Sequence, residues 1–237
     1  FMTDIDRRAH QVDQFVDDLV AADANSPDFG KRVDAITTMG AKEIRDAAGQ
    51  SNRFLDRPVR AMDQEAGVGK DLAELRRVVE DLDPGKRGNL TAPQKLFGIL
   101  PFGNKMRNYF DSYKSSQTHI SSILKSLSSG KDELLMDNAA IDTERANLWT
   151  AMGRLEQMIH LSKVMDQRLE DKANELDATD PAKAKAIRET ALFYARQRTQ
   201  DLLTQMAVTV QGYLALDLAK KNNVELIKGV DRASTTT

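Results

Sequence analysis

The sequence predicts an all-α fold: an elongated antiparallel bundle whose long helices make a coiled-coil-like hairpin beside a smaller N-terminal helical region. Three observations lead to this fold class. Charged residues make up 30% of the 237 positions and aromatic residues only 5%, which is typical of long helices with solvated faces. Leucine and isoleucine recur every seven residues in the second half of the chain. No stretch alternates apolar and polar residues in the manner of a β-strand.

The N-terminal helical region is expected to span residues 1–83 and to begin with two helices. Residues 4–20 carry apolar side chains at the i, i+4, i+7 spacing of an amphipathic helix. Ser26 is the expected N-cap of the second helix, because its hydroxyl can accept a backbone N–H and Pro27 suits the first helical position. Gly49 is expected to end this helix, since glycine is favoured directly after a helix C-terminus.

A proline interruption, a third helix and a linker are predicted next. Pro58 should interrupt or restart a short helical piece, because proline lacks the backbone donor that a helix interior needs. Apolar residues at helical spacing predict a helix from about Lys70 to Leu82. Residues 84–95 contain two prolines, two glycines and no periodicity. They are therefore predicted to be the linker between two regions of the chain.

Residues 96–230 are predicted to form the long-helix bundle, followed by a truncated tail at 231–237. Gly130 is expected to separate the first helix of this bundle from the second. The last helix should start sharply, because Asp180 can cap its first turn and Pro181 suits its first position. The three helices are expected at about 104–128, 131–176 and 180–228.

A seven-residue repeat runs through the middle helix and predicts left-handed packing against long neighbouring helices. Its positions are Leu134, Ile141, Leu148, Leu155, Ser162, Leu169 and Leu176. In the last helix, apolar residues from Leu202 to Leu218 spread around most of the circumference. That distribution predicts a central helix surrounded by others. The aromatic residues Trp149, Tyr109, Tyr113 and Tyr213 are likewise expected in the core, with their polar ends hydrogen-bonded.

The charge balance and the residue inventory limit the function. The formal net charge is −2 with both signs interleaved, so no basic surface for nucleic acid is expected. The chain has no cysteine, which excludes disulfides, thiolate metal sites and a cysteine nucleophile and fits a reducing compartment. No transmembrane segment is expected, because polar residues interrupt the most apolar helix. Peripheral membrane association is left open.

No catalytic, cofactor or metal site is predicted. The segment AGVGKD matches a phosphate-binding loop only in part, since Gln64 stands where that loop needs glycine and Asp71 where it needs serine or threonine. His10, His119 and His160 have no second histidine at the spacing of a helical metal site. We therefore interpret the chain as a non-enzyme without cofactors.

Several strings of the sequence resemble one protein family. LPFGNKMRNYFDSYKSSQTHISSIL (100–124), GKDELLMDNAAIDTERANLW (130–149) and the run that starts with QDLLTQMAVTVQGYLALDL (200–218) are similar to the TelA-like toxic anion resistance family. The resemblance implies a cytoplasmic bacterial protein of tellurite and stress resistance, with TerD-like proteins of the same system as partners. It implies no catalytic residue.

The leading hypothesis is a non-enzymatic helical interaction or scaffold protein that acts in toxic anion (tellurite) resistance and the stress response. The alternative is a small-anion-binding protein that uses polar residues of the last helix. Polar residues in a mostly apolar helix must pair with facing helices, contact a ligand or partner, or face solvent. The candidate residues are Asp201, Gln205, Gln211, Tyr213, Asn222, Asn223, Lys228, Phe102 and Asn104.

Overall fold

The structure, a computed structural model, describes residues 4–55, 67–83 and 102–236. Every regular element in these ranges is a helix, which confirms the all-α prediction. The chain divides into two compact units, and each unit combines two separate parts of the sequence. The interruption predicted at Pro58 and the linker predicted at 84–95 lie outside the described residues.

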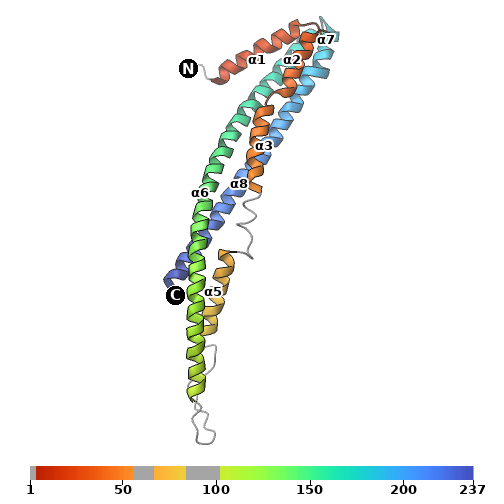
Figure 1. Cartoon of the computed structure of the whole chain (residues 1–237). Helices are drawn as coiled ribbons and strands as arrows, with labels where there is room; N and C mark the ends of the chain where they lie inside the picture. The colour runs from red at the N-terminus through yellow and green to blue at the C-terminus, as the bar shows by residue number, and fades with distance from the viewer. Residues whose placement is uncertain (1–3, 56–66, 84–101, 237) are drawn as a thin grey trace. The chain divides into compact units, whose positions relative to one another are not determined.

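The first unit contains Phe1–Arg57 and Thr143–Asp217, and the second contains Pro58–Asp142 and Leu218–Thr237. Two long helices, α6 and α8, each contribute to both units (Figure 1). The shorter helices α1, α2, α3 and α7 belong to the first unit, and α5 belongs to the second. The helices are α1 (Asp4–Ala21), α2 (Pro27–Thr38), α3 (Ala41–Leu55), α5 (Val68–Leu82), α6 (Phe102–Leu176), α7 (Pro181–Ile187), a π-helical turn (Arg188–Leu192) and α8 (Phe193–Thr236).

Both predicted N-caps are confirmed. The Ser26 hydroxyl accepts the backbone N–H of Phe29 at 3.2 Å, and Pro27 takes the first position of α2. The Asp180 carboxylate accepts the backbone N–H of Lys183 at 3.1 Å at the start of α7. Each cap satisfies a donor that the first turn of a helix cannot pair internally.

The predicted helix end at Gly49 is wrong, because the break occurs at Met39 and Gly40. Gly40 has φ of +71°, a backbone conformation that residues with a side chain rarely adopt. The break is also held from outside, since Arg198 of α8 donates two hydrogen bonds to the Met39 carbonyl oxygen at 3.0 and 2.9 Å. The site of the break thus depends on a residue about 160 positions away, which local glycine spacing does not reveal.

The predicted boundary at Gly130 is also wrong, because α6 continues through it without a break. A Cβ atom on Gly130 would collide with the side chain of Val68, at the start of α5. Gly130 therefore serves close packing between α5 and α6 rather than helix termination. Similarly, α8 continues past Gly229 to Thr236, and Leu72 of α5 lies 3.1 Å from where a Cβ on Gly229 would be.

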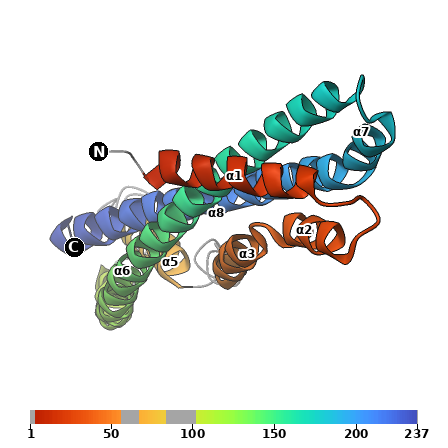
Figure 2. The same ribbon diagram turned by 90° about the horizontal axis from the view of Figure 1, so that it is seen from above.

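The core of the first unit lies between α6, α8 and the N-terminal helices, which lie beside them (Figures 1 and 2). One cluster joins α1 and α2 to the end of α6 and the start of α8, and a second joins α3 to the next turns of both long helices. Positions of the predicted seven-residue repeat face these clusters. Leu148, Leu155, Ser162 and Leu169 are all 0% exposed.

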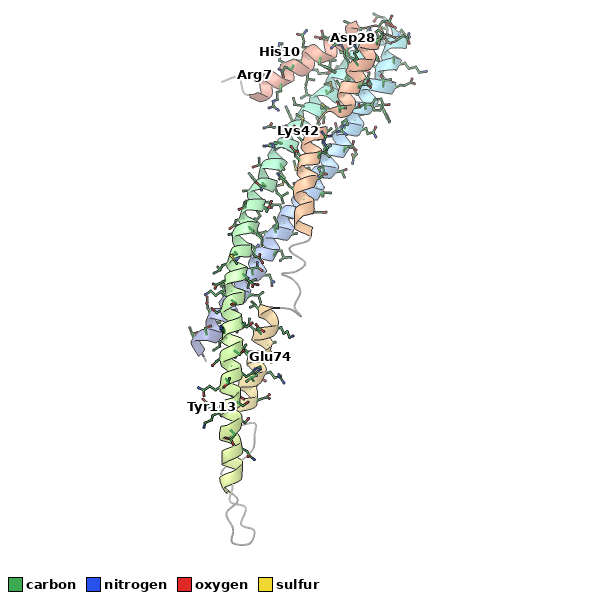
Figure 3. The ribbon with its side chains drawn as sticks, in the orientation of Figure 1. Arg7, His10, Asp28, Lys42, Glu74 and Tyr113 are labelled. Atoms are coloured by element: carbon green, nitrogen blue, oxygen red, sulfur yellow. The ribbon has the colours of Figure 1, made fainter. Side chains whose placement is uncertain are left out.

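The core of the second unit joins α5 to the first part of α6 and the end of α8. Its buried side chains are Val68, Leu75, Val78, Ile123, Leu127, Leu134 and Val230. At its edge, Glu74 of α5, which Figure 3 labels, contacts His119 of α6 at 2.9 Å. Tyr113, which the sequence places in the core, is 46% exposed.

Substitution of Gly130 tests whether close packing, not helix termination, requires a glycine there. Gly130→Ala should lower the free energy of unfolding by about 1–3 kcal/mol, because the added methyl group overpacks against the stiff Val68 side chain. Gly153→Ala is the matched control, since Gly153 is a helical glycine of α6 with no atom within 4 Å of its Cβ position. It should raise stability by about 1 kcal/mol through helix propensity. Urea unfolding measures both, and equal stabilisation by the two variants would contradict the packing role.

Arg198→Met tests the brace at the α2–α3 break. The variant keeps apolar bulk but leaves the Met39 carbonyl without its two donors, so the free energy of unfolding should fall by about 2 kcal/mol. Arg154→Met is the control, because Arg154 is 58% exposed and its ion pair with Asp46 is 4.0 Å long. It should change stability by less than about 0.5 kcal/mol. Similar losses in both variants, measured by urea unfolding, would argue against the brace.

Candidate interaction surface

The buried side of α8 follows a seven-residue spacing that the sequence analysis did not identify. None of the six residues at this spacing is more than 2% exposed. They are Ala195, Leu202, Thr209, Leu216, Asn223 and Val230. A single row of this kind places one side of a helix against its neighbours and leaves the opposite side free. The helix is therefore packed on one side and is not surrounded.

The opposite side of α8 is apolar and exposed, which corrects the prediction of a central helix. Within the first unit, Leu203 is 39% exposed, Val210 38% and Leu214 59%. Ala207 is also exposed. The four residues are spaced by four, three and four positions, so they form one straight row on the helix. We call Leu203, Ala207, Val210 and Leu214 the α8 outer face.

An exposed tryptophan lies next to this face. Trp149 of α6 is 67% exposed, although the sequence places it in the core, and its ring centroid lies 5.9 Å from that of Tyr213. Arg145 stacks over the Tyr213 ring at 4.9 Å and donates a hydrogen bond to its hydroxyl oxygen at 3.1 Å. The same guanidinium contacts Asp217 at 3.1 Å. Tyr213 is thus fixed by Arg145, while its aromatic neighbour Trp149 faces solvent.

The outer face has no charged residue of its own. From Leu202 to Leu216 the chain contains no Asp, Glu, Lys or Arg. The carboxylates that border this stretch both have partners, since Asp201 pairs with Arg198 at 3.0 Å and Asp217 pairs with Arg145. The surface therefore offers apolar contact area and not a charge pattern.

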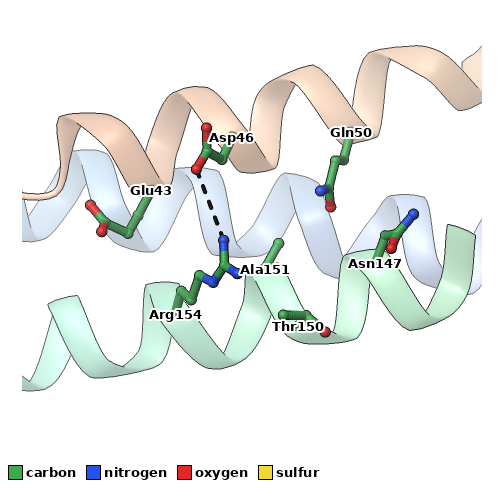
Figure 4. Close-up of a pocket in the computed structure, with 7 residues that line it drawn as sticks. All are labelled: Glu43, Asp46, Gln50, Asn147, Thr150, Ala151 and Arg154. Carbon is green, nitrogen blue, oxygen red and sulfur yellow. Dashed lines mark ion pairs between the residues drawn. The ribbon is translucent and has the colours of Figure 1, made fainter.

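A small polar cavity of about 110 Å³ lies between α3 and α6 in the first unit (Figure 4). Glu43, Asp46 and Gln50 line it from α3, and Asn147, Thr150, Ala151 and Arg154 line it from α6. In Figure 4 the Gln50 side chain points across the cavity towards Asn147. The Gln50 carbonyl oxygen is buried and has no hydrogen-bond partner among the described residues.

The cavity is rich in hydrogen-bond acceptors. Thr150 donates its hydroxyl hydrogen to the Ala146 carbonyl oxygen at 3.0 Å, and Asn147 donates an amide hydrogen to Glu144 at 3.2 Å. Both side chains therefore present oxygen atoms to further donors. Arg154 is the charged donor in the lining, and it faces two carboxylates. The charged residues of the lining sum to about −1, which disfavours an anion in the cavity. The cavity suits water or another hydrogen-bond donor.

The pKa shifts that the structure resolves belong to ion pairs elsewhere on the surface. Hydrogen bonding by Arg188 lowers the pKa of Asp177 at the α6–α7 turn. Lys228 likewise lowers the pKa of Glu225, to which it donates a hydrogen bond at 2.7 Å. Within the described ranges, no three His, Cys, Asp or Glu side chains gather at a metal-binding distance. Of the helices described, none has the length and apolar character needed to cross a bilayer.

The residues selected from the sequence do not form one site. Asp201, Gln211, Asn222 and Lys228 are exposed along α8. Gln205 is partly buried and donates a hydrogen bond to Thr209 at 3.3 Å. Phe102 and Asn104 are in the first turn of α6, where the structure does not describe side chains. Of this set, Tyr213 lies beside the outer face.

Among the members of that set whose side chains the structure describes, Asn223 alone is fully buried. It is 0% exposed in the second unit and donates an amide hydrogen to the Asn138 carbonyl oxygen of α6 at 3.1 Å. Its own carbonyl oxygen is buried without a hydrogen-bond partner among the described residues. A buried amide pair in an apolar helix seam commonly fixes the register of the two helices. Asn223 thus has a structural role in the second unit.

The Asn138–Asn223 pair can be tested against its neighbour in sequence. Asn223→Ala should lower the free energy of unfolding by about 1–3 kcal/mol, because it leaves a gap and removes the partner of Asn138. Asn222→Ala, at an exposed position, should change it by less than about 0.5 kcal/mol. Replacing both Asn138 and Asn223 by Leu should recover most of the stability. Denaturant unfolding measures all three, and equal effects of the two alanine variants would exclude the register role.

Comparison with known proteins places the chain in a family. No curated protein and no solved structure matches it. The family model described as toxic anion resistance protein (TelA) matches residues 26–237, which is nearly the whole chain. The match covers α2 to α8, and with them both the outer face and the cavity. The chain belongs to the TelA family of toxic anion resistance proteins.

Proposed function

We propose that this chain acts in tellurite resistance and the stress response as a non-enzymatic, cytoplasmic interaction protein that docks through the α8 outer face. The observation that carries the proposal is the exposed apolar row Leu203–Ala207–Val210–Leu214 with Trp149 at its side. Its proposed partners are other proteins of the resistance system, with TerD-like proteins among them. The role in toxic anion resistance itself follows from family membership.

The outer face has the chemistry of a protein contact. Exposed Leu and Val residues aligned on one helix face are the anchors that an apolar groove or a second helix accepts. Trp, Tyr and Arg are the residue types that contribute most to binding energy at protein interfaces, and Trp149, Tyr213 and Arg145 lie together here. Because Arg145 already holds Tyr213 in place, binding would cost little further ordering of this side chain.

A membrane surface fits this face less well than a protein does. Helices that lie on a bilayer flank their apolar side with lysine and arginine, which contact the lipid headgroups. The stretch from Leu202 to Leu216 has no such residue. The apolar row is also a narrow one, spaced like a helix–helix seam. These features support a protein partner.

Direct anion binding, the alternative, has less support. Asp201 would repel an anion, and Gln205 already donates a hydrogen bond to Thr209. The α3–α6 cavity presents mainly oxygen acceptors and two carboxylates, which an oxyanion would have to approach. Isothermal titration of the chain with tellurite should therefore give no saturable heat. Saturable binding that is lost in Arg154→Gln or Gln211→Ala would favour the alternative.

A resistance assay tests the proposed function. The gene with Leu203→Gln and Leu214→Gln should protect a host that lacks its own copy far less than the unchanged gene does, measured as the tellurite concentration that halves growth. The reason is that both substitutions replace apolar contacts of the outer face without touching the buried side of α8. Because both positions are exposed, the thermal midpoint of the purified variant should stay within a few degrees of the original.

Val208→Gln supplies the control for this assay. Val208 is 45% exposed and apolar and belongs to the same stretch of α8, but it lies outside the outer face. It should leave protection unchanged. Full protection by the double variant, at equal protein level, would overturn the proposed role of the face. Equal loss in both variants would show a general effect of polar substitution and would overturn it as well.

A further inference from the structure

Helix α1 is attached to the rest of the first unit through its second half. Val12, Val16 and Leu19 are 7%, 1% and 0% exposed, and their spacing of four and three puts them on one side of the helix. Of the side chains described before Val12, none is buried, and Arg7 and His10 are exposed (Figure 3). In both ribbon views α1 crosses α6 at an angle (Figures 1 and 2). The contact of α1 with the unit is therefore short.

The surface that α1 covers is built by other parts of the first unit. It is the remainder of the same core cluster, which α2, the end of α6, α7, the π-helical turn and the start of α8 contribute. We call this surface the α1 seat; its largest side chains are Phe29, Ile36, Met165, Leu169, Ile187 and Leu192. The family match begins at residue 26. The seat therefore lies in the matched part of the chain, and α1 lies before it.

The turn between α1 and α2 has anchors of its own. Lys183 of α7 donates a hydrogen bond to the Ala22 carbonyl oxygen. The Asp23 carboxylate accepts the backbone N–H of Asn25 at 2.8 Å, and the Ser26 hydroxyl donates to the Asp23 carbonyl oxygen at 2.7 Å. None of these bonds involves a side chain of α1. Release of α1 therefore needs a change of backbone angles only at its last residues.

Opposite charges lie on the two sides of the contact between α1 and its seat. The segment 12–21 of α1 carries three aspartates and no lysine or arginine. Each aspartate pairs with a basic side chain of α2 or α6. The pairs are Asp13–Arg168 at 2.7 Å, Asp17–Lys172 at 3.4 Å and Asp18–Arg32 at 3.4 Å. The seat thus favours an acidic helix by charge as well as by apolar contact.

Two of these basic residues keep a carboxylate when α1 leaves. Arg32 also contacts Asp28 of its own helix at 3.2 Å, and Lys172 contacts Glu175 of its own helix at 3.4 Å. An open seat therefore does not leave these two charges unpaired. The ion pairs to α1 are partly exposed, so salt weakens them. A short apolar contact with exposed ion pairs is typical of a segment that opens locally.

We propose that α1 is a reversible cover of the α1 seat. It leaves as one helix while the rest of the first unit stays folded, and the open seat binds an acidic amphipathic helix of a partner protein. Helix α1 shows the chemistry of that partner: apolar residues spaced four and three on one side, with a carboxylate directly after each of the first two. The seat shares no residue with the α8 outer face, so the inference does not depend on the proposed function.

The tether makes α1 an autoinhibitory element. A segment joined to its own binding surface by a short turn competes with a free partner as if it were present at about millimolar concentration. A partner helix therefore binds strongly only after α1 has been loosened. The ion pairs of Asp13, Asp17 and Asp18 set how readily this happens.

Hydrogen exchange on the full 237-residue chain tests the release of α1. The amides of α1 should exchange through a local opening that low urea concentrations barely affect, whereas those in the middle of α6 should show a steep urea dependence. Raising NaCl from about 0.05 M to about 0.5 M should speed exchange in α1 about tenfold and leave α2 unchanged. A common urea dependence of α1 and α2 would overturn the proposal, because α1 would then open only together with its seat.

Two carboxylate variants test the ion pairs. Asp13→Asn combined with Asp17→Asn should speed exchange in α1 at low salt and remove most of its salt dependence. Asp166→Asn is the matched control, since Asp166 of α6 pairs at 2.7 Å with Arg196 of α8 and not with α1. It should leave exchange in α1 unchanged. Equal acceleration of α1 by both variants would contradict the proposal.

A labelled peptide of residues 4–21 tests the open seat by fluorescence anisotropy. Leu19→Asp in the full chain should displace its own α1, because it places a charge at a position that is 0% exposed. This variant should bind the peptide at least about tenfold more tightly than the unchanged chain does. Absence of binding, in a variant whose α6 exchange is unchanged, would overturn the proposal. If the variant unfolds, the exchange test on the unchanged chain decides.

A charge exchange tests the specificity of the seat. A peptide with Asp13→Lys and Asp17→Lys should bind the Leu19→Asp variant at least about tenfold more weakly than the original peptide. It should bind again when the chain also carries Arg168→Glu and Lys172→Glu. Equal binding of both peptides to the Leu19→Asp variant would indicate apolar contact without selection and would overturn the acidic helix as the ligand.

Discussion

The one-sided contact between α6 and α8 is the constraint on which each unit depends. In the first unit, buried positions at seven-residue spacing on α8 face buried repeat positions on α6, and the contact includes a hydrogen bond of 2.8 Å from Thr199 to Ser162. In the second unit, the same spacing on α8 reaches Asn223 and Val230. One row of buried residues on α8 packs against neighbouring helices in both units. The shorter helices therefore complete each core from the sides that α6 and α8 leave open. The break between α2 and α3 at Gly40 is one result of this packing, because Arg198 of α8 holds it in place.

The same constraint explains why the outer face of α8 is available. A helix that buries one row of side chains can carry polar residues on the other side at no loss of core packing. The α8 outer face instead keeps Leu203, Val210 and Leu214 exposed, next to Trp149. Aligned exposed apolar residues of this kind mark interaction surfaces and favour association. The cavity between α3 and α6, by contrast, is small and acceptor-rich, and it offers little to an oxyanion.

Local patterns in the sequence were sufficient for the fold class and for several helix ends. The caps at Ser26 and Asp180 were predictable because they depend on residues within the first turn. The predicted helix boundary at Gly130 was wrong, because glycine is needed there for close contact with Val68, which is distant in the sequence. No residue spacing along the chain indicates that contact. The outer face was missed because the apolar residues of α8 were counted around the whole circumference. The buried residues of α8 repeat every seven positions. This spacing is visible in the sequence and separates the buried side of the helix from the exposed side.

The most direct test of the central claim, that the α8 outer face binds a protein, is site-specific photo-cross-linking in living cells. A benzophenone side chain would replace Leu214 in one strain and Val208 in another, at native expression level. Our account predicts a discrete cross-linked product from position 214, heavier than the chain alone, and none from position 208. No product from position 214, or the same products from both positions, would contradict it.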